Sequence, residues 1–327
     1  MSATLGAPDA RALFARMRDR SILVVGDLMI DEWIWGAVTR ISPEAPVPVV
    51  AVTDHSFTLG GAGNVANNLR ALDAHVEFVG TVGEDVFADD VRRMLGEEQV
   101  DTAGIFSVAD RPTTRKTRIV AHNQQVVRAD WEDASPLAPG DRARVVAYVR
   151  ERAAACDAVI LSDYAKGLLS GDIVEAARAC PLVLADPKPA NLELFGGVTC
   201  VAPNVHEAEL ASGIRITDEA SLALAGRVLL EKLDCAYVVI TRGEHGMSLF
   251  GKGGEHLTIP SVARKVFDVS GAGDTVIAVL ALALAGGASI EQAMQLANFA
   301  AAAVVEKLGT ATASADEIVA LIEHGRQ

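Results

Sequence analysis

The chain has 327 residues, of which half are apolar and 22% charged, with 43 acidic against 29 basic side chains and a formal net charge of −14. This balance is typical of a globular protein, and the length allows one large or two modest domains around a sizeable core. Nucleic acids and anionic membranes are met by broad basic faces, which an acidic chain of this kind lacks. We therefore expect no nucleic-acid partner and no membrane partner.

Targeting and redox signals indicate a soluble, cytoplasmic protein. The N-terminus shows no apolar region before a small-residue cleavage site, and the most apolar run, 276–288, is too short to cross a bilayer. The cysteines are far apart in the sequence and form no CxxC pair, so we expect buried, reduced thiols rather than a disulfide or zinc site. They are Cys156, Cys180, Cys200 and Cys235.

Short apolar runs alternate with helical patterns along most of the chain. The runs end in Asp, Asn, Gly or Thr, and they lie at 21–31, 76–83, 158–164, 182–188, 200–204 and 236–243. Apolar residues at i, i+3 and i+4 predict helices at 63–74, 89–100, 140–156, 171–180 and 218–233. This α/β alternation predicts a mostly parallel sheet with helices on both faces. Ligands of such sheets bind at the carboxyl ends of the strands.

Two segments break the alternation. They are rich in Val, Ile, Thr and Trp and have no helical periodicity, which predicts strands outside the main sheet. We expect a single domain, 1–327, that carries a small β-layer whose strands lie within about 32–58 and 111–133.

The second of these segments concentrates positive charge at Arg115, Lys116, Arg118 and Arg128. Two interpretations compete: a solvated strand edge that discourages association, or a docking surface for an anionic ligand. Strand alternation places Lys116 and Arg118 on one face and Arg115 on the other, where we expect a plain surface residue.

A glycine-rich loop precedes the apolar helix near the C-terminus. Residues Gly271, Ala272 and Gly273 would let backbone N–H groups converge at a helix N-terminus, which is a ready anion hole. Asp274 follows in the first turn. A carboxylate beside an anion hole suits phosphoryl transfer, because it can accept the proton of the attacking hydroxyl. A tight turn and a helix-start acid explain the same residues equally well.

Two further stretches could bind a polar ligand. Gly60 and Gly61 would let a ligand approach the backbone, and the amide of Asn64, which can donate and accept, suits sugar hydroxyls. Asp27 and Asp31 follow the first strand and could bind two sugar hydroxyls. A loop, a turn and a cap are alternative explanations for each stretch taken alone.

The order of these motifs resembles the PfkB or ribokinase family of sugar kinases, across roughly residues 20 to 312. The resemblance rests on Gly-Asp after the first strand, Gly-Gly-x-x-x-Asn, "APNVHEAE", "TRGEHG" and "DVSGAGDT". It implies a ribokinase-like fold with a β-sheet lid, Asp274 as catalytic base, and an anion hole at 271–273. Val276 stands where many members carry Phe, which we interpret as a packing difference.

The same resemblance implies where ATP and metal ions bind. Asn204 and Glu207 would organise Mg²⁺ and the phosphates, largely through water. The residues expected along the nucleotide are Thr241, Arg242, Gly243, Gly246 and, beside the adenine, Asn298. Asp268 and Ser270 fall where related kinases hold a monovalent cation such as K⁺, with Gly309 closing that loop. Lys166 and Lys188 each follow a strand-end Asp and could help at the phosphates or be surface residues.

Longer strings resemble one branch of this family, the kinases of D-glycero-D-manno-heptose 7-phosphate. They are "RISPEAPVPVV", "NQQVVRAD", "DYAKGLL" and "VFDVSGAGDTV". The resemblance implies ATP-dependent phosphorylation of the anomeric 1-hydroxyl in ADP-heptose and lipopolysaccharide core biosynthesis. Asp27, Asp31, Gly60, Gly61 and Asn64 would position the sugar. Lys116, Arg118 and Arg128 become the candidates for holding the 7-phosphate.

Many relatives fuse a nucleotidyltransferase domain behind the kinase. Because this chain ends at Gln327, we expect the kinase-only form, with the β-layer pairing two subunits into a homodimer. Two alternatives stay open: a kinase for another sugar or a nucleoside, and a non-catalytic sugar or nucleotide sensor. A nicotinamide dehydrogenase is disfavoured because its fingerprint is missing after the first strand.

Overall fold

The structure is a computed structural model that describes residues 5–122 and 124–324. Its main sheet has the strand order β13-β12-β11-β10-β9-β8-β1-β4-β5. The strands from β11 to β5 in that order are parallel, and β12 and β13 add an antiparallel edge. Their bounds are β1 Ser21–Gly26, β4 His75–Val82, β5 Asp101–Ser107, β8 Ala158–Ser162, β9 Val183–Asp186, β10 Cys200–Val201, β11 Tyr237–Thr241, β12 Met247–Gly251 and β13 His256–Ile259.

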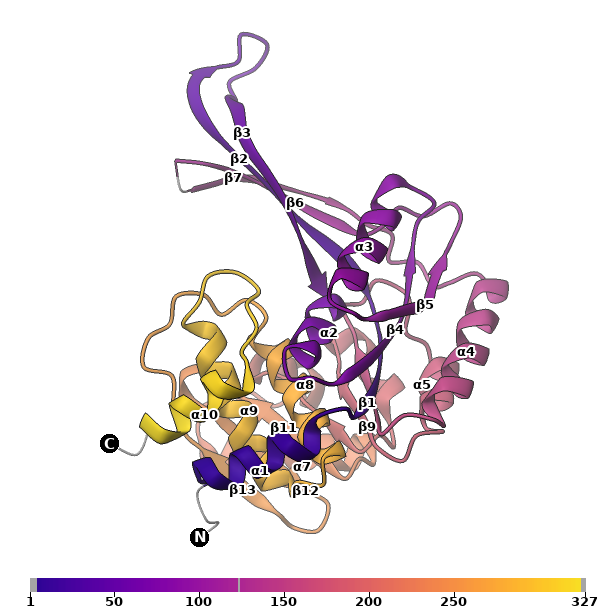
Figure 1. The fold of residues 1–327 in the computed structure, drawn as a ribbon, viewed down its shortest axis with the longest axis vertical. Helices are drawn as coiled ribbons and strands as arrows, with labels where there is room; N and C mark the ends of the chain where they lie inside the picture. The colour runs from indigo at the N-terminus through magenta and orange to yellow at the C-terminus, as the bar shows by residue number, and fades with distance from the viewer. Residues whose placement is uncertain (1–4, 123, 325–327) are drawn as a thin grey trace.

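Helices cover both faces of this sheet (Figure 1). Their bounds are α1 Ala7–Met17, α2 Ala62–Arg70, α3 Val86–Glu97, α4 Pro139–Ala153, α5 Gly171–Ala177, α6 Val205–Ser212, α7 Glu219–Leu233, α8 Ala272–Ala285, α9 Ile290–Val305 and α10 Ala315–His324. Two short 3₁₀ turns lie at Pro189–Phe195 and Gly243–His245. The predicted α/β class, with a mostly parallel central sheet and helices on both faces, is confirmed.

The core has one apolar cluster on each side of the sheet. In β1, Ile22 and Val24 belong to the first cluster, whereas Leu23 and Val25 belong to the second, as the two-residue period of a strand requires. All four side chains are fully buried, which explains the continuous apolar run.

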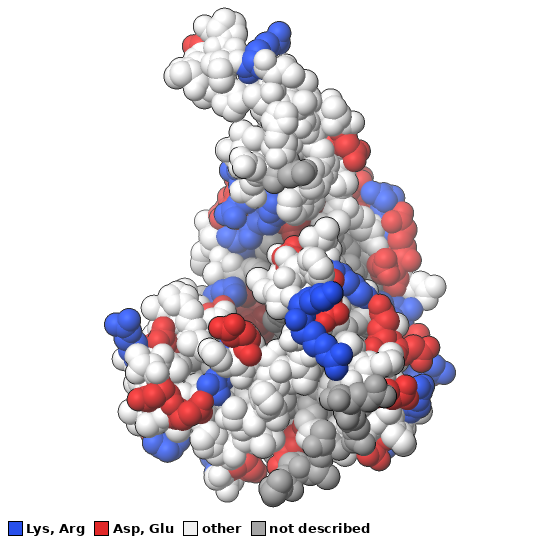
Figure 2. All heavy atoms as spheres, turned by 90° about the vertical axis from the view of Figure 1, so that its left-hand side faces the viewer, with Lys and Arg blue, Asp and Glu red and all other residues white. Residues whose placement is uncertain are grey.

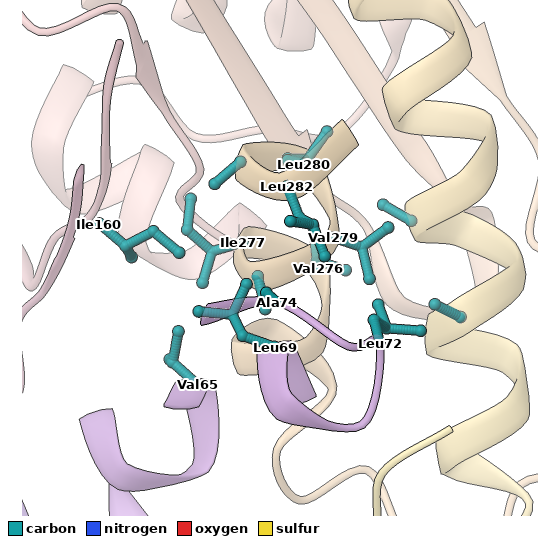
Figure 3. Close-up of a cluster of buried hydrophobic side chains, with 14 of the residues drawn as sticks. Val65, Leu69, Leu72, Ala74, Ile160, Val276, Ile277, Val279, Leu280 and Leu282 are labelled. Atoms are coloured by element: carbon teal, nitrogen blue, oxygen red, sulfur yellow. The ribbon is translucent and has the colours of Figure 1, made fainter. Parts of the chain in front are cut away.

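Helix α8 runs through the first cluster and is buried from Asp274 to Ala283. Figure 3 shows Ile277 and Val279 of this helix among Leu69 of α2 and Leu72 just after it. An apolar surface all around a helix is typical of a core helix. The packing therefore fixes the position of the α8 N-terminus, which carries the glycine-rich loop.

A second, smaller sheet, called here the lid, projects from the body (Figure 1). Its strand order is β3-β2-β6-β7, with β2 antiparallel to β3, β2 parallel to β6, and β6 antiparallel to β7. The bounds are β2 Leu28–Ile41, β3 Pro48–Gly61, β6 Arg115–Ala121 and β7 Gln124–Trp131. The first hairpin thus extends beyond the expected 32–58 at both ends, while β6 and β7 lie inside 111–133.

Two further predictions concerned the cysteines and a membrane span. All four cysteines are free, with Cys156 half-buried and the other three buried. Within the described ranges, each helix is too short or too polar to serve as a membrane span.

Candidate active site

Polar side chains gather where parallel strands end opposite the start of α8. A cavity of about 120 Å³ lies there. It is lined by Tyr164, Asp186, Lys188, Ala202, Asn204, Glu207, Thr241, Gly271, Gly273 and Asp274. Strands β8, β9 and β11 and helix α6 therefore deliver their polar ends to the same place as the glycine-rich loop.

Asp274 is buried and held from two sides. Its Oδ1 accepts a hydrogen bond from the Tyr164 hydroxyl at 2.6 Å, and its Oδ2 accepts one from Asn64 Nδ2 at 2.8 Å. Burial raises the pKa of Asp274 to about 6, although both hydrogen bonds and the nearby Lys188 ammonium act in the opposite direction. A carboxylate with a pKa near 6 is ionised at neutral pH and suits a general base.

The start of α8 depends on a glycine. Gly271 caps the helix with φ of 77°, and a β-carbon there would collide with the Asn64 side-chain amide. Gly271 and Gly273 line the cavity beside Asp274. The Ala272 amide instead donates to the Val269 carbonyl at 3.2 Å. Two of the three residues predicted for the anion hole therefore face the cavity, and the third supports the turn.

A larger, mostly apolar cleft of about 440 Å³ adjoins this cavity. It is lined by Thr241, Gly243, Glu244, Gly246, Met247, Ser261, Ala263, Val266, Val269, Ala272, Gly273, Val276, Asn298, Ala301, Ala302 and Val305. Apolar walls with a few polar groups suit a nucleoside. Besides Asn204 and Glu207, five residues were predicted along the nucleotide. Four of them line this cleft, namely Thr241, Gly243, Gly246 and Asn298.

Arg242 is the fifth residue that was predicted along the nucleotide. Its guanidinium pairs with Glu219 at 2.6 Å and donates to the Ser248 hydroxyl at 3.1 Å, and it does not line the cleft. These contacts tie Arg242 to the first turn of α7 and to β12. Its side chain holds the "TRGEHG" loop in place, whereas the glycines of that loop form the cleft wall.

Asn204 and Glu207 form a reciprocal cap at the start of α6. The Asn204 amide donates to Glu207 Oε2, and the Glu207 amide donates to Asn204 Oδ1, both at 2.9 Å. The Lys188 ammonium lies 2.6 Å from Glu207 Oε1. Both carboxylate oxygens of Glu207 are thus engaged.

Glu207 and Asp186 supply carboxylate oxygens to the small cavity, and such oxygens are the donors that Mg²⁺ prefers. No cluster of three metal-ligating side chains is close enough to hold an ion directly in residues 5–122 and 124–324. The donor set therefore fits an ion held through water and through the phosphates of a nucleotide.

Asp268 closes the loop expected to hold a monovalent cation. Its Oδ1 accepts from the Ser270 amide at 2.9 Å, and its Oδ2 accepts from the Gly309 amide at 3.0 Å. These hydrogen bonds lower the pKa of Asp268. They join the segments before α8 and after α9 at the edge of the nucleotide cleft.

The two acids after the first strand have different environments. Asp27 is buried and accepts hydrogen bonds from the backbone amides of Tyr164, Lys166 and Leu168 at 2.9, 3.0 and 3.3 Å. Asp31, on β2, pairs with Arg118 at 2.5 Å. Asp27 therefore holds the 163–168 loop, whereas Asp31 joins β2 to β6 within the lid through its ion pair with Arg118.

The glycines that precede α2 approach these acids closely. Gly60 pairs with Met29 in the β2–β3 ladder, and a β-carbon on Gly60 would collide with the Asp31 carboxylate. Gly61 has φ of 57°, and a β-carbon there would strike the Asp27 carbonyl. Asn64 follows in α2, where its side chain turns to Asp274.

Three of the basic lid residues, Lys116, Arg118 and Arg128, lie together and are called here the basic cluster. Arg118 faces Arg128 across the β6–β7 ladder, and Lys116 faces Asp31 across the β2–β6 ladder. Figure 2 shows blue side chains on the lower part of the lid, above a hollow in which red side chains are visible.

The members of the basic cluster differ in how they are neutralised. Arg128 is half exposed and makes two hydrogen bonds to the Asp130 carboxylate, at 2.9 and 3.1 Å. Lys116 is half-buried and forms no ion pair with any described residue. Burial, followed by the repulsion of Lys166, lowers its pKa, whereas the carboxylates of Asp31 and Asp130 act in the opposite direction. A half-buried ammonium that forms no ion pair can be stabilised by an anion.

The prediction that Arg115 is a plain surface residue is wrong. Its guanidinium is stacked 3.9 Å from the Phe87 ring centroid and 4.0 Å from that of Trp131, and it pairs with Glu32 at 3.3 Å. Its side chain is only 14% exposed. The alternation correctly put it on the opposite face from Lys116, but that face packs against α3, so Arg115 joins the lid to the body.

Three residues that reasoning from the sequence did not assign also shape the site. Tyr164 contacts Asp274 directly, and Asp163 accepts hydrogen bonds from the Ala165 amide, the Lys188 amide and Asn191. Asp186 lines the cavity, and burial raises its pKa to about 8. All three lie at strand ends, and that position was the signal that could have found them.

Comparisons with known proteins agree with this architecture. The family model described as "pfkB family carbohydrate kinase" matches residues 19–317. The "Bifunctional protein HldE" of Geobacter metallireducens is 46% identical over 317 residues, covering 95% of this chain and 64% of that protein. The protein of the same name from Wolinella succinogenes is 46% identical over 312 residues, covering 94% and 65%. The chain thus spans a little under two thirds of the length of these relatives.

Solved structures share the fold at low sequence identity. A ribokinase of Arabidopsis thaliana, complexed with ribose and ATP, superposes with a TM-score of 0.75 at 21% identity, covering 93% of this chain and 99% of that one. Phosphofructokinase-2 of Escherichia coli, in complex with substrates and products, gives 0.76 at 17% identity, covering 94% and 100%.

The fold, the cleft and the family match together define a sugar kinase. The chain belongs to the PfkB family of carbohydrate kinases, and the predicted ribokinase-like fold is confirmed. Use of ATP as the phosphoryl donor follows from membership of this family.

Proposed function

We propose that this kinase transfers the ATP γ-phosphoryl group to the anomeric 1-hydroxyl of D-glycero-D-manno-heptose 7-phosphate, giving the 1,7-bisphosphate for ADP-heptose and lipopolysaccharide core biosynthesis. The observation that carries the proposal is Lys116, a half-buried ammonium that forms no ion pair with a described residue, beside Arg118 and Arg128. An acceptor that already bears a phosphate needs such a group, whereas an uncharged sugar does not. The likeness to the HldE proteins over 94–95% of the chain supports the same acceptor.

In the proposed mechanism, Asp274 accepts the proton of the attacking hydroxyl while the oxygen of that hydroxyl bonds to the γ-phosphorus. The bond between the γ-phosphorus and the β,γ-bridging oxygen breaks, and ADP leaves with the electron pair of that bond. The amides at Gly271 and Gly273 and the α8 N-terminus stabilise negative charge on the transferring group. Asp31, Gly60, Gly61 and Asn64 would surround the sugar, with Asp27 holding the loop beneath it. Gly60 and Gly61 let the backbone pass close to Asp31 and Asp27, which keeps these acids beside the sugar.

Residues on the nucleotide side would hold the cofactors. Mg²⁺ would bind near Glu207 and Asn204 through water, where it neutralises phosphate charge. Lys188, paired with Glu207 in the same cavity, can turn to a phosphate oxygen when the nucleotide enters. A monovalent cation such as K⁺ would sit at the loop of Asp268 and Ser270, whose ends are already joined through Gly309.

We further propose that the lid pairs two subunits into a homodimer in the cytoplasm. Apolar side chains stay exposed on this sheet, among them Trp35 at 38%, Val52 at 60% and Val127 at 48%. Exposed apolar side chains on a projecting sheet can be covered by a second subunit. Sedimentation velocity on the wild type and on Val52→Glu checks the proposal, and a monomeric wild type would contradict it.

Steady-state kinetics on a panel of acceptors test the proposed substrate. Heptose 7-phosphate, the same heptose without phosphate, ribose, fructose and adenosine are compared at saturating ATP. We expect kcat/KM for heptose 7-phosphate to exceed that for the unphosphorylated heptose by at least about 100-fold, and phosphorus NMR of the product to show a new anomeric phosphate. A preference for any uncharged acceptor would overturn the proposal.

A further inference from the structure

The loop between β8 and α5, residues 163–168, carries a tyrosine directly to the proposed base. Tyr164 donates its hydroxyl hydrogen to Asp274 Oδ1 at 2.6 Å, a short distance typical of a hydrogen bond to an ionised acceptor. Tyr164 also lines the small cavity together with Gly271 and Gly273. Its ring therefore forms part of the wall against which a phosphoryl group would be transferred.

This loop is held by buried carboxylates on its body side. Asp27 accepts from three of its backbone amides, and Asp163 accepts from the Ala165 amide at 2.8 Å. Ala165 and Gly167 have φ of 54° and 86°, so the backbone turns sharply within a few residues. A β-carbon on Gly167 would collide with the Ser135 carbonyl, which shows how little space the turn has. The tyrosine is consequently presented by a rigid support.

The opposite oxygen of the base is held just as firmly. Asn64 donates to Asp274 Oδ2 at 2.8 Å, and Asn68 in turn donates to the Asn64 carbonyl at 2.8 Å. One donor on each oxygen fixes the orientation of a carboxylate that would otherwise rotate about its side-chain torsions. Each oxygen keeps a second lone pair for an incoming hydroxyl.

We propose that Tyr164 is a positioning residue for phosphoryl transfer, fixing the orientation of the Asp274 carboxylate and favouring its ionised form. The inference rests on the proposed role of Asp274 as general base. The phenol keeps its own proton throughout, and the proton of the acceptor hydroxyl passes to Asp274. Burial, and then the charge of Asp274, raise the pKa of Tyr164 well above its usual value, so that the phenol stays a donor.

Several charged groups surround Asp274 and raise or lower its pKa. Lys188 favours ionised Asp274, whereas Asp31 from β2 and Asp186 after β9 disfavour it. Glu207 from α6 lines the same cavity and is neutralised by Lys188. The Tyr164 hydrogen bond is the leading contribution that lowers the pKa of Asp274 against burial. Its removal therefore leaves a weaker acid that stays protonated to higher pH.

Tyr164→Phe tests the inference, because it removes the hydroxyl and keeps the ring. We expect kcat to fall about tenfold, KM for both substrates to stay within about twofold, and the acid limb of the kcat profile to move to higher pH. Tyr148→Phe is the matched control, since Tyr148 also bonds to a carboxylate, Glu77, but lies outside the site. Unchanged kcat together with an unmoved acid limb in Tyr164→Phe would overturn the inference.

A second replacement predicts the opposite shift. Tyr164→3-fluorotyrosine gives a more acidic phenol, which strengthens the hydrogen bond to the carboxylate, so the acid limb is expected to move to lower pH. Asp274→Asn, measured in parallel, separates the two proposals. Full turnover in Asp274→Asn would overturn the base itself, whereas an inactive Asp274→Asn beside a Tyr164→Phe that matches the wild type would overturn only the positioning role.

Discussion

The body and the lid, called here the body wall and the lid wall of the proposed acceptor site, are built differently. On the body wall, the carboxylates of Asp274 and Glu207 each have both oxygens engaged by named donors, and the elements that carry them are anchored in the core. On the lid wall, Lys116 forms no ion pair with a described residue, and Arg128 is half exposed on a projecting sheet. The difference suggests that the reaction depends on the rigid body, while selection of the acceptor depends on the adaptable lid.

The strongest way to break this comparison is to remove the proposed base, Asp274, on the body wall. Asp274→Asn should lower kcat by about 10² to 10⁴ while leaving binding of an ATP analogue within about twofold, because a general base contributes about that much to the rate. Stopped assays with labelled ATP and a thermal melt check both points, with Asp234→Asn, an exposed acid on the body, as the control.

The same residue sets the pH dependence. Because the pKa of Asp274 is raised to about 6, the base becomes protonated as the pH falls through that value. We expect kcat to fall on the acid side of about pH 6, and a flat profile down to pH 4 would contradict the assignment.

The next largest effect should come from the lid wall. Lys116→Ala combined with Arg118→Ala should raise KM for heptose 7-phosphate about 10- to 100-fold and leave KM for ATP unchanged, because Lys116 would lose one charge-assisted hydrogen bond of about 1.5 to 3 kcal/mol, whereas Arg118 is already paired with Asp31. Arg40→Ala, at the exposed far end of β2, is the matched control. An unchanged KM for the acceptor would favour the solvated-edge interpretation of the basic cluster.

The free energy of unfolding tests how Asp186 is buried in the body wall. Burial raises the pKa of Asp186 to about 8, so the folded protein holds a proton that the unfolded chain loses near pH 4. The free energy of unfolding therefore falls as the pH rises between these values. Asp186→Asn should be more stable than the wild type at pH 8, on the order of 1 kcal/mol, with the gain shrinking toward pH 4. Urea titrations at several pH values check this, with Asp9→Asn as an exposed control; equal stability at pH 8 would contradict it.

The smallest effect is expected within the basic cluster. Arg128 is half exposed and already chelated by Asp130, so Arg128→Ala should raise KM for the acceptor by less than about threefold. Initial rates at varied acceptor concentration measure the change. A larger rise would show that Arg128 leaves Asp130 to bind the phosphate.

Sequence patterns predicted the centre of the main sheet better than its edge strands. The β-branched runs and helical periods predicted every parallel strand except β5, and helices α2, α3, α4, α5 and α7, because burial on both faces leaves a clear signal. Strands β5, β12 and β13 lie at the two margins of the sheet, where exposed positions mix polar residues into the pattern, and they were missed. The first strand was predicted to stop at Gly26 and Asp27, and β1 does end at Gly26, but the residues after Asp27 begin β2 instead of forming a loop.

For the site, motif order indicated Asp274 and its glycines, but it could not indicate their partners. Tyr164 lies 110 positions from Asp274, and only the packing of β8 beside the core helix brings the two together. The assignment of Arg115 failed for a related reason. Alternation tells which face a side chain occupies, whereas the identity of what covers that face, here Phe87, depends on tertiary structure.

The parallel pairing of β2 with β6 has an evolutionary consequence. Lys116 is opposite Asp31 in that ladder, so the phase of one short strand would decide which side chains meet the proposed acceptor. Inserting a single residue before β6 would replace Lys116 and Arg118 by Arg115 and Thr117 on that face, and deleting one would replace them by Thr117 and Ile119. A descendant of this enzyme could thus acquire a different acceptor through one indel in the segment that leads into β6, with every residue of the phosphoryl-transfer machinery left untouched.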